Sequence, residues 1–214
     1  MTIAAKICGL ASEDAVAAAV EGGAAFVGFV FNPPSPRSVT PERAAALCRA
    51  LPAGVHRVGL FVDADDDTIA ATLSVAPLDI LQFHGVEFPE RVAEARRRFG
   101  CKVMKAISIA GPDDVEGAAL YDEAADLLLF DATPPRRRGA LPGGNGLAFD
   151  WRLIAGRQWR LPWMLSGGLT AEFLPEAVRI SGATAVDVSS GVEAAPGRKD
   201  PAKIRAFLDV ARGL

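Results

Sequence analysis

The sequence contains little cysteine, histidine and tyrosine, and it has no long apolar segment. Its three cysteines are an odd number without paired spacing, which argues against a disulfide framework and favours a reducing compartment. No apolar segment approaches the roughly 18 residues that a membrane span requires. Residues 1–16 also lack the basic region and the following apolar region of a signal peptide. We therefore expect a cytoplasmic protein with no membrane partner.

A strong charge of either sign is also absent. The chain carries 23 Lys and Arg against 26 Asp and Glu, a net charge of −3, so its overall charge does not favour nucleic acid as a partner. Of its 214 residues 50% are hydrophobic, which is enough for a large buried core. Barrels of the α/β class commonly hold about 200–250 residues in one domain. Because no linker or shift in composition divides the chain, we expect a single domain over residues 1–214.

Short apolar segments alternate along the chain with amphipathic, alanine-rich segments. The apolar segments are rich in Val, Ile, Leu and Phe without polar alternation, which is typical of parallel strands buried on both faces. The predicted strands are 2–8, 25–31, 56–62, 78–84, 102–107, 126–130, 162–166 and 184–189. The predicted helices lie near 12–21, 41–50, 65–74, 87–99, 112–120, 150–155, 171–179 and 200–211. Helix-start signals occur at Ser12 with Asp14, at Thr40 before Pro41 and at Asp200 before Pro201.

This order of elements predicts an α/β protein, a single-domain (β/α)8 TIM barrel, because eight strand–helix units fill the chain. An open, doubly wound sheet is the alternative. In a barrel the functional site lies at the carboxyl ends of the strands. Polar and glycine-rich residues collect at those ends here, whereas the opposite turns are shorter and plainer.

Two glycine-containing loops follow the last two predicted strands. The segment "SGGL" contains Gly167 and Gly168, and "SSGVE" contains Ser189, Ser190 and Gly191. Glycine lets backbone N–H groups approach an anion closely, and in this fold a phosphate often lies between these two loops. The loops therefore predict a small phosphorylated ligand; tight turns that simply require glycine are the alternative.

Cys8 ends the first predicted strand, at the expected site end of the barrel. Side chains alternate along a strand, so Cys8 and Lys6 share one face. A thiol acts as a base only when it is ionised, and the nearby Lys6 ammonium would lower its pKa. The alternative is a small buried hydrophobic residue. We apply that interpretation to Cys48 and Cys101, which do not end a strand.

Asp131 follows the apolar segment 127–130 and precedes a long loop, about residues 132–148. Apolar surroundings raise the pKa of a carboxyl group, so Asp131 could act as a general acid near neutral pH. A turn or helix-capping aspartate is the alternative, but loops of this length are usually functional or disordered, which favours a lid. The loop contains four glycines that could act as hinges and three arginines that form a solvated face or steer an anionic substrate: Gly139, Gly143, Gly144, Gly146, Arg136, Arg137 and Arg138.

Four further polar residues lie on or after strands. Arg37 follows the second strand and could hold a carboxylate bidentately, although a surface arginine paired with a helix carboxylate is the alternative. His84 ends the fourth strand and is either a ligand contact or a hydrogen-bonded structural residue. Asp187 lies within the eighth strand and could face the pocket or brace a loop. His56 starts the third strand, away from the site, and is interpreted as structural.

At these residues the chain resembles the phosphoribosylanthranilate isomerase family over almost its whole length. Each matching motif is short, but their order along the chain makes the resemblance specific. The motifs are "KICGL" (6–10), "VGFVFNPPSPRSV" (27–39), "VGLFVD" (58–63), "LQFHG" (81–85), "LLFDA" (128–132) with "GGNGLAFDW" (143–151), "LSGGL" (165–169) and "AVDVSSGVEAAPGRKD" (185–200).

The resemblance implies an Amadori rearrangement that uses neither a metal nor an organic cofactor. N-(5-phosphoribosyl)anthranilate would become 1-(2-carboxyphenylamino)-1-deoxyribulose 5-phosphate, the third step from chorismate to tryptophan. Cys8 would be the general base, Asp131 the general acid and Arg37 the clamp on the anthranilate carboxylate. The two glycine loops would hold the phosphate, and the protein would be a monomer or a homodimer.

Three positions depart from the family pattern, and none removes a catalytic group. Phe83 stands where Leu is usual, Ser166 stands where Ala is common, and Asn145 lies in the lid. The last two could change contacts of the phosphate or of the lid.

Three other functions fit these residues less well. A metal-dependent phosphosugar epimerase would need clustered metal ligands, and the two histidines lie at opposite ends of their strands. Indole-glycerol-phosphate synthase would need Lys and Glu at strand ends; Lys105 is near one, but no Glu ends a predicted strand. A non-catalytic phosphate binder would keep the glycine loops and lose Cys8 or Asp131, and this chain has both.

Overall fold

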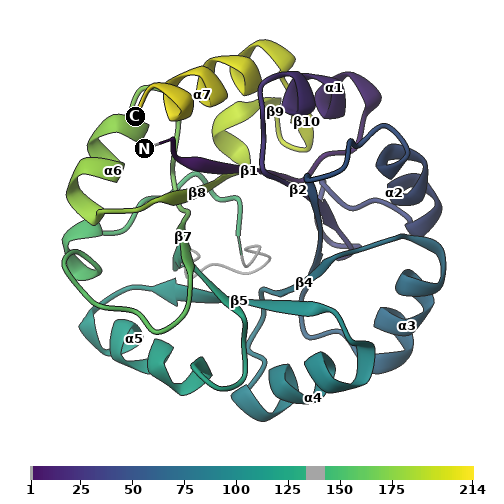
Figure 1. Cartoon of the computed structure of the whole chain (residues 1–214), viewed down its shortest axis with the longest axis horizontal. Helices are drawn as coiled ribbons and strands as arrows, with labels where there is room; N and C mark the ends of the chain where they lie inside the picture. The colour runs from purple at the N-terminus through teal and green to yellow at the C-terminus, as the bar shows by residue number, and fades with distance from the viewer. Residues whose placement is uncertain (1, 134–142) are drawn as a thin grey trace.

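The structure is a computed structural model that describes residues 2–133 and 143–214. Eight parallel strands form a closed barrel in the order β1 to β8. The closure is made by β1 and β8, with Lys6 opposite Asp187. The predicted (β/α)8 barrel is therefore confirmed, and the open sheet is wrong (Figure 1).

The strands and helices alternate along the described chain. The barrel strands are β1 (Ala4–Cys8), β2 (Phe26–Val30), β3 (His56–Phe61), β4 (Ile80–Phe83), β5 (Lys102–Ile109), β6 (Leu127–Ala132), β7 (Trp163–Leu165) and β8 (Ala185–Val188). The helices are α1 (Glu13–Glu21), α2 (Pro41–Cys48), α3 (Asp66–Val75), α4 (Pro89–Phe99), α5 (Pro112–Gly117), α6 (Leu174–Ser181) and α7 (Pro201–Gly213). In the described ranges, no helix is long and apolar enough to cross a membrane.

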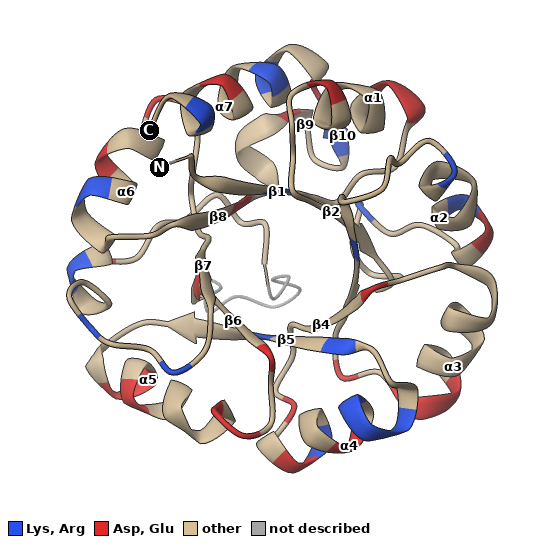
Figure 2. Cartoon of the chain, viewed as in Figure 1, with Lys and Arg blue, Asp and Glu red and all other residues tan. Residues whose placement is uncertain are grey.

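Apolar side chains cover both faces of the sheet, as the absence of polar alternation in the strands predicts. The outer face packs against the helices in one large core that includes Ile7, Val27 and Phe29. Inside the barrel, a second cluster with Val58 and Met104 fills the interior. Most charged residues instead lie on the surrounding helices and loops, with both signs interspersed in this view (Figure 2).

Two of the three predicted helix starts have the expected cap. The Thr40 side chain accepts a hydrogen bond from the backbone N–H of Arg43, and Asp200 accepts two from the first turn of α7. Ser12 occupies the cap position of α1 but donates its hydroxyl to Asp14 instead of accepting from the backbone.

The structure differs from the predicted elements in two places. The helix expected at 150–155 is only a 3-10 turn, η2 (Trp151–Leu153). After β8 the chain forms another 3-10 turn, η3 (Ser190–Val192), and then a small hairpin of β9 (Glu193–Ala195) and β10 (Arg198–Lys199), which the sequence did not predict. A Cβ on Gly197 would lie 2.3 Å from the carbonyl oxygen of Pro36, so the hairpin packs directly against the loop that carries Arg37.

Candidate active site

A pocket lies at the carboxyl ends of the barrel strands, with about 740 Å³ of empty volume including its open mouth. Every candidate site residue predicted above lines it: Cys8, Arg37, His84, Asp131, Gly167, Gly168, Asp187, Ser189, Ser190 and Gly191. Residues 143–147, the described end of the long loop, also line this pocket. The predicted arginines Arg136–Arg138 and the hinge residue Gly139 lie outside the described residues.

Cys8 ends β1 with its side chain directed into this pocket, and the residue is only 4% exposed. Gly28 lies beside it on β2, and a Cβ at that position would be 3.1 Å from the sulfur. Glycine therefore leaves the room that the thiol occupies. Lys6 is on the same face, as predicted, but its ammonium donates to Asp187 at 2.9 Å.

The electrostatic prediction for Cys8 needs correction. Burial raises the pKa of the Cys8 thiol above its ordinary value of 9.0, although the ammonium groups of Lys6 and Lys199 act in the opposite direction. Lys6 was expected to lower this pKa, but Asp187 compensates its charge and itself raises the pKa of the thiol. The thiol is therefore neutral at neutral pH when the pocket holds no substrate.

Asp131 lies within β6, not after it, and faces the same pocket. Its Oδ1 accepts the N–H of Ala132 at 2.9 Å, and its Oδ2 lies 3.2 Å from Nε2 of His84. Asp131 is only 6% exposed, and polar groups contact both of its carboxyl oxygens, which the sequence did not predict. A Cβ on Gly143 would lie 2.7 Å from His84 Nε2 and 3.1 Å from Asp131 Oδ2, so the returning loop covers this pair.

Gln82 fixes the orientation of His84. Its amide nitrogen lies 2.9 Å from Nδ1 of His84, and both side chains are buried. If the amide donates, Nδ1 carries no proton and the ring proton lies on Nε2, which is 3.2 Å from Oδ2 of Asp131 but forms no hydrogen bond to a described residue. The sequence analysis did not identify Gln82, although it lies in the motif "LQFHG". Gln82 precedes His84 by two residues, so both side chains point to the same, inward side of β4.

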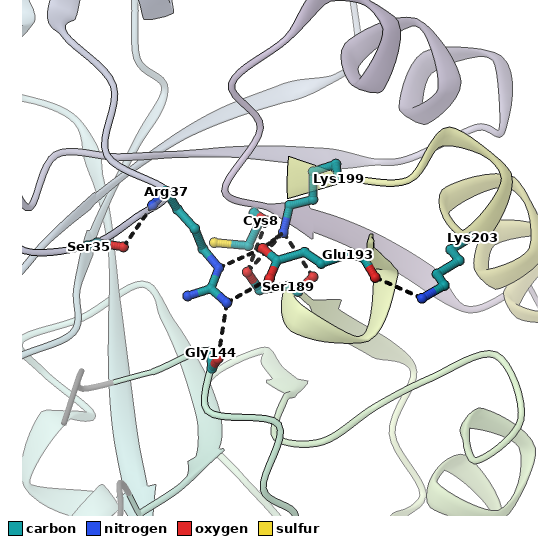
Figure 3. Close-up of polar contacts among 8 residues, drawn as sticks. All are labelled: Cys8, Ser35, Arg37, Gly144, Ser189, Glu193, Lys199 and Lys203. Carbon is teal, nitrogen blue, oxygen red and sulfur yellow. Dashed lines mark hydrogen bonds and ion pairs between the residues drawn. The ribbon is translucent and has the colours of Figure 1, made fainter. Parts of the chain in front are cut away.

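Arg37 is buried, not on the surface, and holds a bidentate ion pair with a carboxylate of the protein itself. Its Nε lies 2.7 Å from Oε1 of Glu193, and its Nη2 lies 2.9 Å from Oε2. The same Nη2 also donates to the carbonyl oxygen of Gly144 at 3.1 Å. The partner is a hairpin carboxylate rather than a surface helix carboxylate (Figure 3).

The two glycine loops contact one another on one side of the pocket. Gly167 and Gly168 both have positive φ, at 88° and 66°. A Cβ on Gly191 would lie 1.9 Å from the carbonyl oxygen of Leu169, so the loops can pack this closely only with glycine there. The hydroxyl of Ser189 donates to the carbonyl oxygen of Cys8 at 3.2 Å, which ties the second loop to the end of β1.

The structure places two of the three residues that depart from the family pattern. Phe83 is fully buried in the core between the sheet and the helices, away from the pocket. Ser166 lines the pocket and donates to Oδ2 of Asp187 at 3.3 Å.

A further buried ion pair, between Lys105 and Glu87, bears on the alternative function of indole-glycerol-phosphate synthase. Lys105 and Glu87 lie 2.8 Å apart with 3% of each side chain exposed, and neither lines the pocket. The Lys and Glu that indole-glycerol-phosphate synthase would need are therefore paired outside this site. His56 is exposed at the start of β3 and packs against Phe26, in agreement with a structural position. In the part of the chain that the structure describes, no three His, Cys, Asp or Glu residues gather as a metal site.

The closed barrel and the polar pocket at its carboxyl rim place the chain in the class of (β/α)8-barrel proteins with a ligand site at that rim. A family model described as N-(5'-phosphoribosyl)anthranilate (PRA) isomerase matches residues 5–210. The chain belongs to this N-(5'-phosphoribosyl)anthranilate isomerase family, as the resemblance predicted.

Individual relatives agree over the full length. The N-(5'-phosphoribosyl)anthranilate isomerase of Rhodospirillum centenum is 58% identical over 214 residues, which are 100% of both chains. The one from Paramagnetospirillum magneticum is 56% identical over 213 residues, covering 100% of this chain and 99% of the relative. The crystal structure of the Thermotoga maritima enzyme has a TM-score of 0.88 at 38% identity, and the match covers 99% of this chain and 100% of that one. A structure of phosphoribosyl anthranilate isomerase in complex with reduced 1-(o-carboxyphenylamino)-1-deoxyribulose 5-phosphate has a TM-score of 0.85 at 37% identity, with the same coverage.

Proposed function

We propose that Cys8 is the general base and Asp131 the general acid of the isomerisation of N-(5-phosphoribosyl)anthranilate to 1-(2-carboxyphenylamino)-1-deoxyribulose 5-phosphate. As a member of its family the chain is an isomerase of tryptophan biosynthesis. The observation that carries the assignment of roles is that both side chains line one pocket, from β1 and β6. These strands lie three apart in the ring, which leaves room for a sugar between base and acid.

The reaction consists of ring opening and proton transfers, and the two side chains serve the first two of these transfers. Asp131 gives a proton to the ring oxygen of the ribosylamine, the C1–O bond breaks, and the nitrogen lone pair forms a protonated imine. Cys8 removes the C2 proton, whose electron pair forms the C1–C2 double bond of an enolamine. Loss of the hydroxyl proton at C2 and protonation of C1 then give the ketone, and no electrons are gained or lost overall.

The imine accounts for how a buried cysteine can supply the thiolate that the second proton transfer requires. Burial raises the pKa of Cys8 in the empty pocket. A positive charge that develops next to the sulfur favours the thiolate. Ring opening by Asp131 would therefore prepare the second proton transfer by making C2 more acidic and the thiolate more stable.

The anionic ends of the substrate have matching groups in the pocket. The contacting loops with Gly167, Gly168 and Gly191 would hold the phosphate through backbone N–H groups. Arg37 would bind the anthranilate carboxylate through Nη1, which hydrogen-bonds to no described residue. His84 and Asp187 would contact the sugar.

The replacement Arg37→Ala should mainly weaken substrate binding, because it removes a charge-assisted pair. We expect KM to rise by about tenfold or more with a smaller change in kcat. Arg43→Ala is the control, since Arg43 also pairs with a glutamate, Glu13, but lies outside the pocket. An unchanged KM in Arg37→Ala would count against the carboxylate clamp.

The replacement Gly191→Ala should push the two phosphate loops apart, because its Cβ would meet the Leu169 carbonyl. We expect a higher KM and weaker inhibition by inorganic phosphate. Gly117→Ala is the control, since a Cβ at that helix position would meet nothing within 4 Å. Equal phosphate inhibition in the two variants would argue that the phosphate lies elsewhere.

The activity itself is tested by following the loss of phosphoribosylanthranilate fluorescence with the purified protein and identifying the product by mass spectrometry. Product of unchanged mass with a ketose structure is the expected result, in buffer without metal or cofactor. Hydrolysis to anthranilate instead of isomerisation would overturn the proposal.

We further propose that the protein acts in the cytoplasm as a monomer or homodimer. The Thermotoga maritima phosphoribosylanthranilate isomerase is described as dimeric. Analytical ultracentrifugation of this chain distinguishes the two states.

A further inference from the structure

The hairpin β9–β10 carries two buried charged residues that contact Arg37 and Ser189 of the candidate site. The side chains of Glu193 and Lys199 are 5% and 1% exposed, and Arg37 beside them is 7% exposed. We call Arg37, Glu193 and Lys199 the hairpin cluster. Burying ions is costly unless their partners compensate for the lost water, so the contacts of each charge show what the cluster does.

Lys199 is an ammonium whose three protons are all used. Its Nζ lies 2.8 Å from the carbonyl oxygen of Ser189, 2.9 Å from Oε1 of Glu193 and 3.1 Å from Oγ of Ser189. The hydroxyl of Ser189 gives its one proton to the carbonyl of Cys8, so it must accept from Lys199. Burial lowers the pKa of Lys199 from its ordinary value of 10.5, while Glu193 acts in the opposite direction, and three donated bonds favour the charged form. Because no proton is left over, Lys199 holds other groups in place rather than binding substrate.

Glu193 joins Lys199 to Arg37. Its Oε1 accepts from Lys199 and from Nε of Arg37, while its Oε2 accepts from Nη2 of Arg37. The connection therefore runs from the proposed carboxylate clamp through the hairpin to Ser189, and from Ser189 to the end of β1 (Figure 3). Lys203 supports it from α7 by donating to the backbone carbonyl of Glu193 at 2.7 Å.

The hairpin cluster carries one uncompensated positive charge. It contains two cations and one carboxylate, whereas the neighbouring pair of Lys6 and Asp187 is balanced. The charged groups that act on Cys8 are Lys6 from its own strand, Asp187 from β8 and Lys199 from the hairpin. Lys199 therefore belongs to the cluster that carries the excess positive charge, whereas Lys6 and Asp187 neutralise one another.

We propose that Glu193 and Lys199 are positioning residues: Glu193 directs the Arg37 guanidinium, and Lys199 holds the Ser189 loop and supplies the excess positive charge that favours the Cys8 thiolate. The proposal rests on the proposed function, in which Cys8 is the base and Arg37 the carboxylate clamp. The two residues act through Cys8, Ser189 and Arg37 and do not touch the reacting atoms.

The test measures the pKa of Cys8 directly, by the pH dependence of its alkylation with iodoacetamide, followed on the Cys8 peptide by mass spectrometry. Lys199→Met removes the charge and keeps the chain length, and it should move the midpoint up by about one unit. Glu193→Gln removes the negative charge and should move the midpoint down. It should also raise KM by about tenfold with a smaller effect on kcat, because Arg37 loses its orientation.

The opposite signs separate this proposal from a purely structural role. If the hairpin only kept the pocket closed, both variants would expose Cys8, relieve its burial and lower the midpoint. Arg198→Met is the matched control, because Arg198 is exposed on the same hairpin, and it should change neither the midpoint nor KM. Lys199→Arg keeps the charge and should restore the wild-type midpoint.

An unchanged or lowered midpoint in Lys199→Met would overturn the charge role, and an unchanged KM in Glu193→Gln would overturn the positioning of Arg37. If Lys199→Met does not fold, Lys199→Gln removes the same charge and replaces it in the test: a raised midpoint supports the charge role, and an unchanged or lowered midpoint rejects it. Alkylation does not depend on turnover. Failure of the proposed function would therefore appear as an inactive wild type, independently of the midpoints.

Discussion

Cys8→Ser lowers kcat by roughly 10²–10⁴-fold if the thiol removes the C2 proton, since this is the usual contribution of one positioned proton transfer. Serine preserves the size of the side chain, but its hydroxyl is far less acidic and cannot supply an anionic base. The measurement is steady-state kinetics with phosphoribosylanthranilate, together with binding of the product to show that the pocket is intact. Cys101→Ser is the control, because Cys101 lies outside the pocket. A turnover close to that of the wild type in Cys8→Ser would remove Cys8 from the mechanism.

The role of Cys8 as the base also predicts the direction in which kcat/KM changes with pH. Because burial raises the pKa of Cys8 above 9.0, the thiolate fraction of the free enzyme increases only as pH approaches that raised value. The ratio kcat/KM reports the ionisation of the free enzyme, so the contribution of the Cys8 thiolate to it should still be rising at pH 9, and the comparison with Cys8→Ser separates this contribution from that of the acid. Cys8→Ser should lack this rise. A plateau of kcat/KM already at pH 7 in the wild type would contradict the raised pKa.

The barrel was predictable from the sequence because each strand is buried on both faces and therefore lacks polar alternation. Val27 and Phe29 face the helices, while Val58 and Met104 fill the interior, so both sides of the sheet need apolar residues. The segment 150–155 was assigned as a helix from its apparent start at Asp150. There the Asp150 carboxylate does accept the N–H of Arg152, but the turn ends at Leu153 and the chain continues as a loop.

The pocket residues were predictable from position alone, because the carboxyl ends of parallel strands all meet at one rim. The partners that fix those residues were not. Glu193 and Arg37 are 156 positions apart, and they meet only because the hairpin folds back onto the loop after β2. The pKa of Cys8 was also misjudged, because the sequence shows Lys6 nearby and does not show the depth of burial or the compensation by Asp187.

Asp131→Asn is expected to lower kcat by roughly 10²–10⁴-fold as well, because the amide cannot deliver a proton to the ring oxygen. The side chain keeps its shape and can still accept the N–H of Ala132. Asp126→Asn is the matched control, since Asp126 lies just before β6, at the end opposite to Asp131, pairs with Arg96 and does not line the pocket. We expect Asp126→Asn to keep its turnover, whereas normal turnover in Asp131→Asn would exclude this carboxyl as the acid.

The two variants should also differ in which step limits turnover, and substrate deuterated at C2 reveals the difference. In Cys8→Ser the removal of the C2 proton becomes slow, so the deuterated substrate should react several-fold more slowly than the protiated one. In Asp131→Asn the ring must open without its acid before C2 becomes acidic, so the isotope effect should fall toward one. The same isotope effect in both variants would mean that base and acid act in one step, and a large effect in Asp131→Asn alone would reverse the two assignments.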